Sequence, residues 1–198
     1  MLLFTFIMED SDSELTTYKR MHIDESLFSR IGESDMTAFD ELYQITERAL
    51  YAYTLSLSKD HEEALDLMQE TYVKVISAAH LYKPMGKPLA WLFTISKNTY
   101  LSQIRKNGRV VHMENEQMYN DSRFSYVTDP DDKMVLKVAL DKLTQEESQI
   151  VLLHAVTGMK HKDIAMSLGL GLSTTLSKYH RAIKKMRTYL EERGVYDD

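Results

Sequence analysis

The sequence predicts an all-α protein made of two small helical modules, a helical bundle and a helix-turn-helix, joined by an irregular linker. Only 7 glycines and 3 prolines interrupt the 198 residues, and apolar residues recur at spacings of three and four, as on one face of a helix. Apolar residues make up 43% of the chain, enough for packed cores. No apolar run approaches the ~20 residues that span a bilayer, so we expect no membrane insertion.

Changes in periodicity divide the chain into five segments. The first 35 residues carry 3 basic and 8 acidic side chains, and no core for them to join is evident. We therefore expect a solvated, partly disordered extension, with a short helix at about 24–31. The segments are an acidic N-terminal extension (1–35), a first helical module (36–110), a linker (111–137), a second helical module (138–192) and a tail (193–198).

The charge distribution is compatible with a nucleic-acid partner. The net charge of −6 argues against such a partner at first,. However, residues 97–109 contain four basic side chains and no acid, and residues 172–190 contain five and no acid. Two local basic faces on an acidic chain are compatible with DNA binding. The chain has no cysteine, which excludes disulfides and thiolate chemistry and fits a cytoplasmic protein.

In the first module, the helix predicted over about 61–79 has two distinct faces. At 100° per residue, Met68, Tyr72 and Val75 cluster on an apolar side,. The opposite side carries Asp66, Gln69, Glu70 and Val73. Such a face is either solvated or a docking surface for a partner helix, and spacing alone favours the solvated interpretation.

The next segment predicts a rigid loop followed by a helix. Residues 80–88 hold two of the three prolines, which restrict the backbone. The helix over about 89–105 is apolar on two sides, with Trp91 on one and Phe93 on the other. A helix of this kind is either buried on both sides or presents one side to a partner that is not a protein.

The second module predicts a helix-turn-helix. Thr144 and Glu147 form the pattern of a capping box,, and Gly158 ends the helix that they open. A short helix over 162–168 is closed by Gly169, and Ser173 is placed to cap a third helix running to about residue 190,. Two helices joined by a tight turn that contains glycine define the motif.

The third helix of this motif has a polar, basic face opposite its apolar face. In a major groove, the first residues of such a helix reach base edges and later basic residues meet phosphates. We therefore expect Lys178 to contact bases and Lys184 and Lys185 to contact phosphates. The alternative is a solvated basic face on a three-helix bundle. The polar face comprises Thr174, Ser177, Lys178, Arg181, Lys184 and Lys185.

Both modules contain motifs of one family. The run from Ala64 to Val75, followed by Trp91-Leu-Phe-Thr-Ile-Ser-Lys-Asn98 and Arg105, resembles region two of bacterial RNA polymerase sigma factors. The run from Leu143 to Arg187 resembles region four. Two regions with a short linker between them are similar to the extracytoplasmic-function (ECF) group.

This resemblance implies an alternative sigma factor that binds core RNA polymerase and directs promoter recognition and DNA melting. Asp66, Gln69, Glu70 and Val73 would contact the clamp helices of the polymerase β′ subunit, and region four would meet the β flap. The −10 element would be bound by Tyr82, Lys83, Lys87, Trp91, Lys97, Asn98 and Arg105. The −35 element would be bound by Ser173, Thr174, Ser177, Lys178, Arg181, Lys184 and Lys185.

Other classes of protein fit less of the sequence. A sigma-like protein that binds polymerase or an anti-sigma factor without activating promoters would not need both basic faces. A helix-turn-helix repressor leaves the first module unexplained. An enzyme is the weakest alternative, because His61-Glu62-Glu63 lacks the second histidine of a helical zinc site,. We therefore expect no catalytic residue, metal or cofactor, and an anti-sigma factor is a candidate partner.

Overall fold

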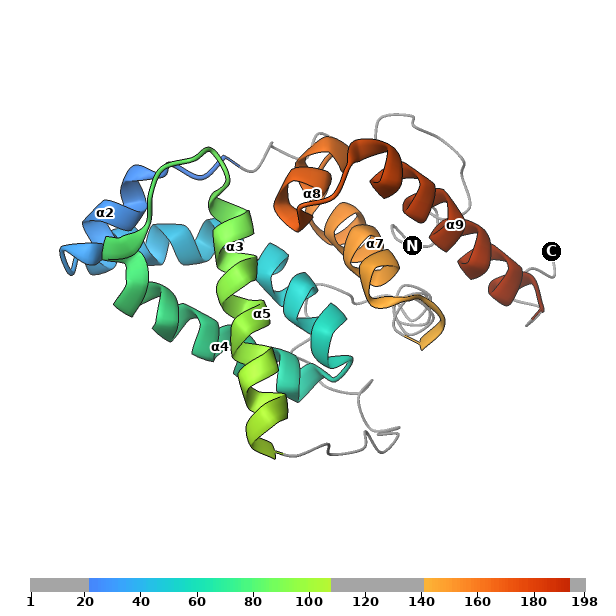
Figure 1. Cartoon of the computed structure of the whole chain (residues 1–198), viewed down its shortest axis with the longest axis horizontal. Coiled ribbons are helices and arrows are strands. Elements are labelled where there is room, and N and C mark those ends of the chain that lie inside the picture. The colour runs from blue at the N-terminus through green and yellow to red at the C-terminus, as the bar shows by residue number, and fades with distance from the viewer. Residues whose placement is uncertain (1–21, 108–140, 193–198) are drawn as a thin grey trace.

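The computed structural model describes residues 22–107 and 141–192, and within these ranges it contains helices and no strand (Figure 1). This confirms the all-α prediction. None of the described helices is both long and apolar enough to cross a membrane. The linker and the tail that the sequence predicts lie outside the described residues, as does the extension before residue 22. The elements are α2 (Ser26–Gly32), α3 (Met36–Ser58), α4 (His61–Ala78), the 3₁₀ helix η1 (Ala79–Leu81), α5 (Pro88–Asn107), α7 (Gln145–Thr157), α8 (His161–Leu168) and α9 (Leu172–Glu192).

The first module is built on α3, the longest helix of the described chain, with α4 and α5 packed against it. Asp60 caps α4 by accepting a hydrogen bond from the backbone of Glu63 (3.0 Å),. The predicted apolar face of α4 is confirmed, since Met68, Tyr72 and Val75 are all buried. The ring of Phe93 on α5 stacks on Tyr53 of α3 with 4.1 Å between centroids, which fixes the third helix of the bundle.

Helix α2 corrects the prediction that residues 1–35 join no core. Ile23, Leu27, Phe28 and Ile31 are buried in the core of the first module. Their spacing is that of a helix with one apolar face. The acidic side chains near them favour a solvated tail, and Asp24 is indeed exposed, but the apolar side chains are buried and Glu25 is half-buried. The first module therefore begins by residue 23, not residue 36.

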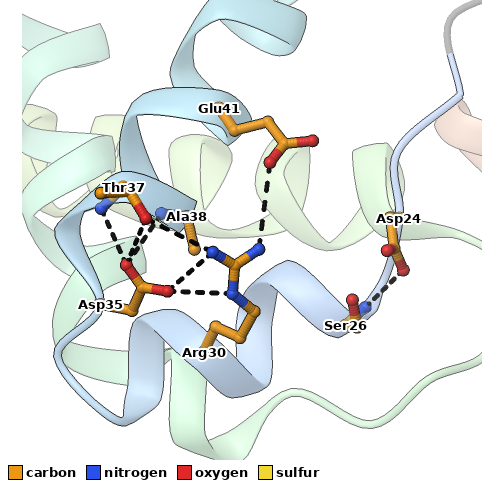
Figure 2. A network of polar contacts seen from close by, with 7 residues as sticks. All are labelled: Asp24, Ser26, Arg30, Asp35, Thr37, Ala38 and Glu41. Atoms are coloured by element: carbon orange, nitrogen blue, oxygen red, sulfur yellow. Dashed lines mark hydrogen bonds and ion pairs between the residues drawn. The ribbon is translucent and has the colours of Figure 1, made fainter.

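A polar network joins α2 to α3 (Figure 2). Asp35 caps α3 by accepting hydrogen bonds from the backbone of Thr37 (2.9 Å) and Ala38 (3.3 Å), and it pairs with Arg30 at 2.7 Å. The hydroxyl of Thr37, followed by the Arg30 guanidinium, lowers the pKa of Asp35 to about 2. Because this pKa is depressed, the network is fully present above the ordinary value of 3.8 and is lost as the pH falls through about 2,.

The second module has the predicted helix-turn-helix. The capping box is present, with Thr144 donating its backbone N–H to Glu147 (2.9 Å) and receiving that residue's N–H on its hydroxyl (3.3 Å). Gly158 and Gly169 end α7 and α8 at positive φ angles of 66° and 69°, where glycine carries no steric penalty. Two helix starts differ from the prediction. Helix α8 begins at His161, and α9 begins at Leu172, so Ser173 lies in the first turn of α9 and does not cap it.

The two modules share one hydrophobic core. Helix α7 packs against α9 and also against α3, and α8 packs against α5. Ile150, Leu152 and Leu153 of α7 belong to the same buried cluster as Leu50 and Leu55 of α3. The second module thus lies beside the first in a closed arrangement (Figure 1); the sequence predicted the two modules but no contact between them.

The burial of α2 generates the first prediction. Phe28→Ala should lower the free energy of unfolding by about 3–5 kcal/mol, because a fully buried aromatic ring is removed,. Ser29→Ala, at an exposed position of the same helix, should change it by less than about 0.5 kcal/mol. Urea denaturation of the full chain measures both. If the Phe28 variant unfolds like the unmodified chain, α2 does not belong to the core.

Candidate functional site

The α4 surface, defined as Asp66, Gln69, Glu70 and Val73, lies opposite the buried face of α4. Asp66 and Gln69 are exposed, and Val73 is 65% exposed although it is apolar. A large apolar side chain between exposed polar ones is the composition of a docking surface.

Glu70 differs from the other members of the α4 surface because it is already engaged. Its carboxylate pairs with Lys74 one turn later (2.7 Å) and accepts a hydrogen bond from Gln103 of α5 (2.7 Å). The hydrogen bond from Lys74 lowers the pKa of Glu70, against the opposing effect of burial. Glu70 is therefore ionised near neutral pH and also ties α4 to α5.

The α5 surface is a line of three predicted residues along one helix. Trp91, Asn98 and Arg105 are spaced by seven residues, so they lie at nearly the same angle around α5 over about 21 Å of its length. The opposite side of the helix holds Leu92 and Ser96, which are buried. Lys97 is exposed but lies about 100° around the helix from Asn98,.

At the N-terminal end of this line, three aromatic rings form a cluster. Tyr82 packs on Phe28 with 4.1 Å between centroids, and Trp91 meets both rings edge-on at 5.1 and 5.2 Å. The hydroxyl of Tyr82 donates a hydrogen bond to Glu25 (2.8 Å). Phe28 and Glu25 lie in the segment predicted to be a solvated extension, so the sequence patterns identify neither as part of the site; the apolar spacing of Leu27, Phe28 and Ile31 is the signal that points to Phe28.

The loop between η1 and α5 carries the two remaining residues predicted for the −10 element. Lys83 and Lys87 are both exposed. Lys87 also lines a cavity of about 460 Å³ between this loop and the turn from α7 to α8, together with Met159, Asp163 and Met166. In the closed arrangement, this loop therefore faces the second module.

The α9 surface comprises the residues predicted for the −35 element. Ser173, Thr174 and Ser177 are exposed in the first two turns, and Arg181 and Lys184 are exposed in the next turns. The apolar arc predicted on the other side is confirmed, because Ala182, Ile183 and Met186 are buried. The structure thus places polar residues first and basic residues later on one side of the helix.

Two lysines of the α9 surface pair with acids of α7. Lys178 lies 2.8 Å from Glu146, and Lys185 lies 2.7 Å from Glu147. Glu147 is only 2% exposed. Its burial raises its pKa, but Lys185 and the backbone N–H of Thr144 outweigh this effect and hold the pKa below its usual value. Lys185 therefore neutralises a buried carboxylate, a structural role that the sequence did not indicate.

A shallow basic groove runs along the second half of α9. It is lined by four cations (Lys142, Arg181, Lys184 and Lys185) and one acid (Glu192), together with Thr188 and Tyr189. The ammonium group of Lys142 lies 5.5 Å from the centroid of the Tyr189 ring. Cations gathered in one groove suit a phosphate backbone. Lys142 precedes α7, and no sequence pattern connected it with this groove.

Within residues 22–107 and 141–192, no group of three histidine, aspartate or glutamate side chains could hold a metal ion. The surfaces that the structure assembles are suited to binding a protein helix and nucleic acid.

Comparisons with known proteins match each of the two modules to a family model. The model of Sigma-70 region 2 matches residues 42–110, and the model of Sigma-70, region 4 matches residues 133–186. The ECF RNA polymerase sigma factor SigE of Mycolicibacterium smegmatis is 31% identical over 83% of this chain and 66% of its own length, so the chain spans just under two thirds of that protein. The ECF RNA polymerase sigma factor EcfG of Rhodopseudomonas palustris is 30% identical over 75% of this chain and 83% of its own length.

Two solved structures resemble most of this chain. The sigma factor RpoE of Bartonella quintana, in complex with the anti-sigma factor NepR, has a TM-score of 0.55 and 27% identity over 77% of this chain and 96% of its own. CnrH, in complex with the cytosolic domain of CnrY, has a TM-score of 0.61 and 22% identity over 85% of this chain and 97% of its own. At that identity, the second likeness shows the fold alone.

The contrast between adjacent lysines generates the second prediction. Lys185→Ala should lower the free energy of unfolding by about 1–3 kcal/mol, because it leaves the buried Glu147 carboxylate without its cation. Lys184→Ala should leave stability unchanged but reduce the salt dependence of duplex DNA binding by about one unit of slope. Thermal unfolding and a salt titration measure the two effects. Equal stability of the two variants would contradict the structural role of Lys185.

Proposed function

Because the chain belongs to the ECF RNA polymerase sigma factors, we propose that it binds core polymerase through the α4 surface and reads a promoter through the α5 and α9 surfaces. The observation that carries this proposal is that α5 and α9 each bury one face in a core and expose polar or basic residues on the other, with the half-buried Trp91 near the start of α5. The order of the modules along the chain matches regions 2 and 4.

The chemistry of the α5 surface favours single-stranded DNA. Unstacked bases bind aromatic side chains, and basic side chains follow the backbone. Trp91 supplies the aromatic end, with Tyr82 packed against its ring, and Lys83, Lys87, Asn98 and Arg105 supply polar and basic groups. This composition supports contact with the −10 element after it has melted, when bases are available for stacking.

The chemistry of the α9 surface favours duplex DNA. Ser173, Thr174 and Ser177 are short enough to let the first turns of the helix enter a major groove, and Arg181 and Lys184 follow them. Lys178 and Lys185 begin from ion pairs with α7, so either lysine must leave its carboxylate to contact DNA. We therefore assign base contacts to the first turns and Arg181, and phosphate contacts chiefly to Lys184.

The closed arrangement supports a requirement for core polymerase. The names of the −10 and −35 elements give their positions in base pairs, so the two elements lie about 25 base pairs apart, which is roughly 85 Å of duplex. A compact chain of this size is only roughly 40 Å across. Both surfaces cannot engage one promoter until α7 separates from α3, and docking of each module on polymerase would supply the free energy for that separation.

The remaining parts of the proposal concern partners and setting. The chain would contribute no catalytic group, since polymerase carries out the chemistry of transcription, and it would act in the cytoplasm where polymerase is found. RpoE of Bartonella quintana forms a complex with an anti-sigma factor, which supports a partner of the same kind here. Such a partner would stabilise the closed arrangement.

Run-off transcription with purified core polymerase and a pool of genomic promoters tests the function as a whole. We expect specific transcripts only when the chain and core are both present, and weak promoter binding by the chain alone, because its net charge is −6 and it is closed. Association with core but no transcript from any promoter would instead favour a sigma-like protein that binds polymerase without activating promoters.

A pair of substitutions tests the α4 surface. Asp66→Ala should weaken binding of core polymerase and leave the melting temperature unchanged, since Asp66 is an exposed residue of α4,. Glu70→Gln should weaken core binding as well, and it should also lower the melting temperature slightly because the Lys74 ion pair is lost. Affinity is measured by titration of labelled chain with core.

Glu41→Ala serves as the control for these substitutions, because it removes an exposed carboxylate of α3 that lies 4.0 Å from Arg30. It should bind core like the unmodified chain. Wild-type affinity in the Asp66 variant, or an equal loss in the Glu41 variant, would show that the docking assignment is wrong.

A further inference from the structure

The loop between η1 and α5 is held in place from α2. One carboxylate oxygen of Glu25 accepts hydrogen bonds from the hydroxyl of Tyr82 (2.8 Å) and the backbone N–H of Met85 (2.9 Å). The loop is otherwise bonded to the two helices that flank it in sequence: the backbone N–H of Tyr82 donates to Ala79 of η1 (3.0 Å), and the carbonyl of Lys87 accepts from Trp91 of α5 (3.3 Å). Glu25 is itself half-buried at the start of α2, and the buried Leu27 and Phe28 anchor that helix.

From this geometry we propose that Glu25 is a positioning residue, which holds the loop in the shape that presents Met85 to an unstacked base of the −10 element. This inference rests on the proposed function. It adds to that function a residue that lies before the segment matched by the region 2 model, which begins at residue 42.

Tyr82 acts in this arrangement as a support for the loop. Its ring is packed against Phe28 and Trp91, and its hydroxyl is bonded to Glu25. Burial, and then the hydrogen bond to Glu25, raise the pKa of Tyr82, so the hydroxyl stays protonated and remains a donor. Both ends of the side chain are occupied, which leaves another residue of the loop to meet the base.

Met85 is the residue that the loop exposes. Its side chain is 73% exposed, although its backbone N–H is fixed by Glu25, and the next residue, Gly86, turns the chain at a φ of +68°. Methionine is among the apolar side chains that insert between bases or pack against them. The exposed Lys83 and Lys87 lie on either side of it in sequence, where they can meet the flanking phosphates.

The carboxylate of Glu25 is engaged by two donors of the loop, the Tyr82 hydroxyl and the Met85 backbone N–H. If these hydrogen bonds are lost, α2 no longer holds the loop. DNA binding must then order the loop, and the free energy needed for this weakens the binding.

The experiment uses the full chain with core polymerase and a promoter that carries 2-aminopurine in the −10 element, whose fluorescence rises when the base unstacks. Glu25→Ala should reduce the yield of unstacked complex about tenfold, the size expected for losing hydrogen bonds to a charged acceptor. Glu25→Gln keeps an acceptor oxygen in the same place and should retain most of the signal. Core affinity and dependence on the −35 element should not change.

A matched control and a double mutant separate positioning from other effects. Glu33→Ala removes an exposed carboxylate at the other end of α2, and it should behave like the unmodified chain. Met85→Ala should lower the signal by itself. Adding Glu25→Ala to it should then have a smaller effect than in the unmodified chain, because the two residues act on one contact.

Three results would overturn the inference. They are an unchanged signal in Glu25→Ala, fully additive effects of the Glu25 and Met85 substitutions, and a loss of core affinity and melting temperature in parallel with the loss of signal. In each case the unmodified chain would still initiate transcription. Failure of the unmodified chain to initiate would instead reject the proposed function.

Discussion

The packing of α7, a helix of the second module, against α3 of the first module is the constraint on which the rest of the structure depends. Ile150, Val151, Leu152 and Leu153 are four consecutive residues, and all are fully buried. At 100° per residue they point to every side of the helix, so α7 must be covered all around. Helices α8 and α9 cover part of it, and α3 covers the rest. Helix α7 is therefore completely covered only when the second module lies against the first.

The sequence indicated the fold class and most helix ends, because these depend on local signals. Capping residues and glycines at positive φ angles act within a few residues, and the Thr144 capping box and Gly169 are where their patterns predicted. The contact between α3 and α7 joins segments separated by the linker, and no local pattern specifies it. The same applies to Lys185, whose partner Glu147 lies on another helix, so its charge alone suggested a phosphate contact.

The sequence also misled where two properties of a segment conflicted. Residues 22–35 are rich in acids, and charge favours a tail, but Ile23, Leu27, Phe28 and Ile31 have helical spacing and are buried. Burial decides the outcome, because each large apolar side chain contributes about 1.5–3 kcal/mol whereas exposed charges cost little in water. As a result, Glu25 and Phe28 lie beside Tyr82 and Trp91, residues that the motif had already identified.

The closed arrangement sets a free-energy cost that any productive partner must offset. Separating α7 from α3 exposes several apolar side chains, each worth about 1.5–3 kcal/mol when fully buried, so the open form is a minor species of the free chain. DNA that binds only the open form has its apparent affinity reduced by the open fraction. A partner that holds the two modules apart therefore raises the apparent affinity for DNA, and a partner that binds the closed form lowers it. The α3–α7 contact therefore allows polymerase and an anti-sigma partner to have opposite effects on promoter binding without either touching the α9 surface.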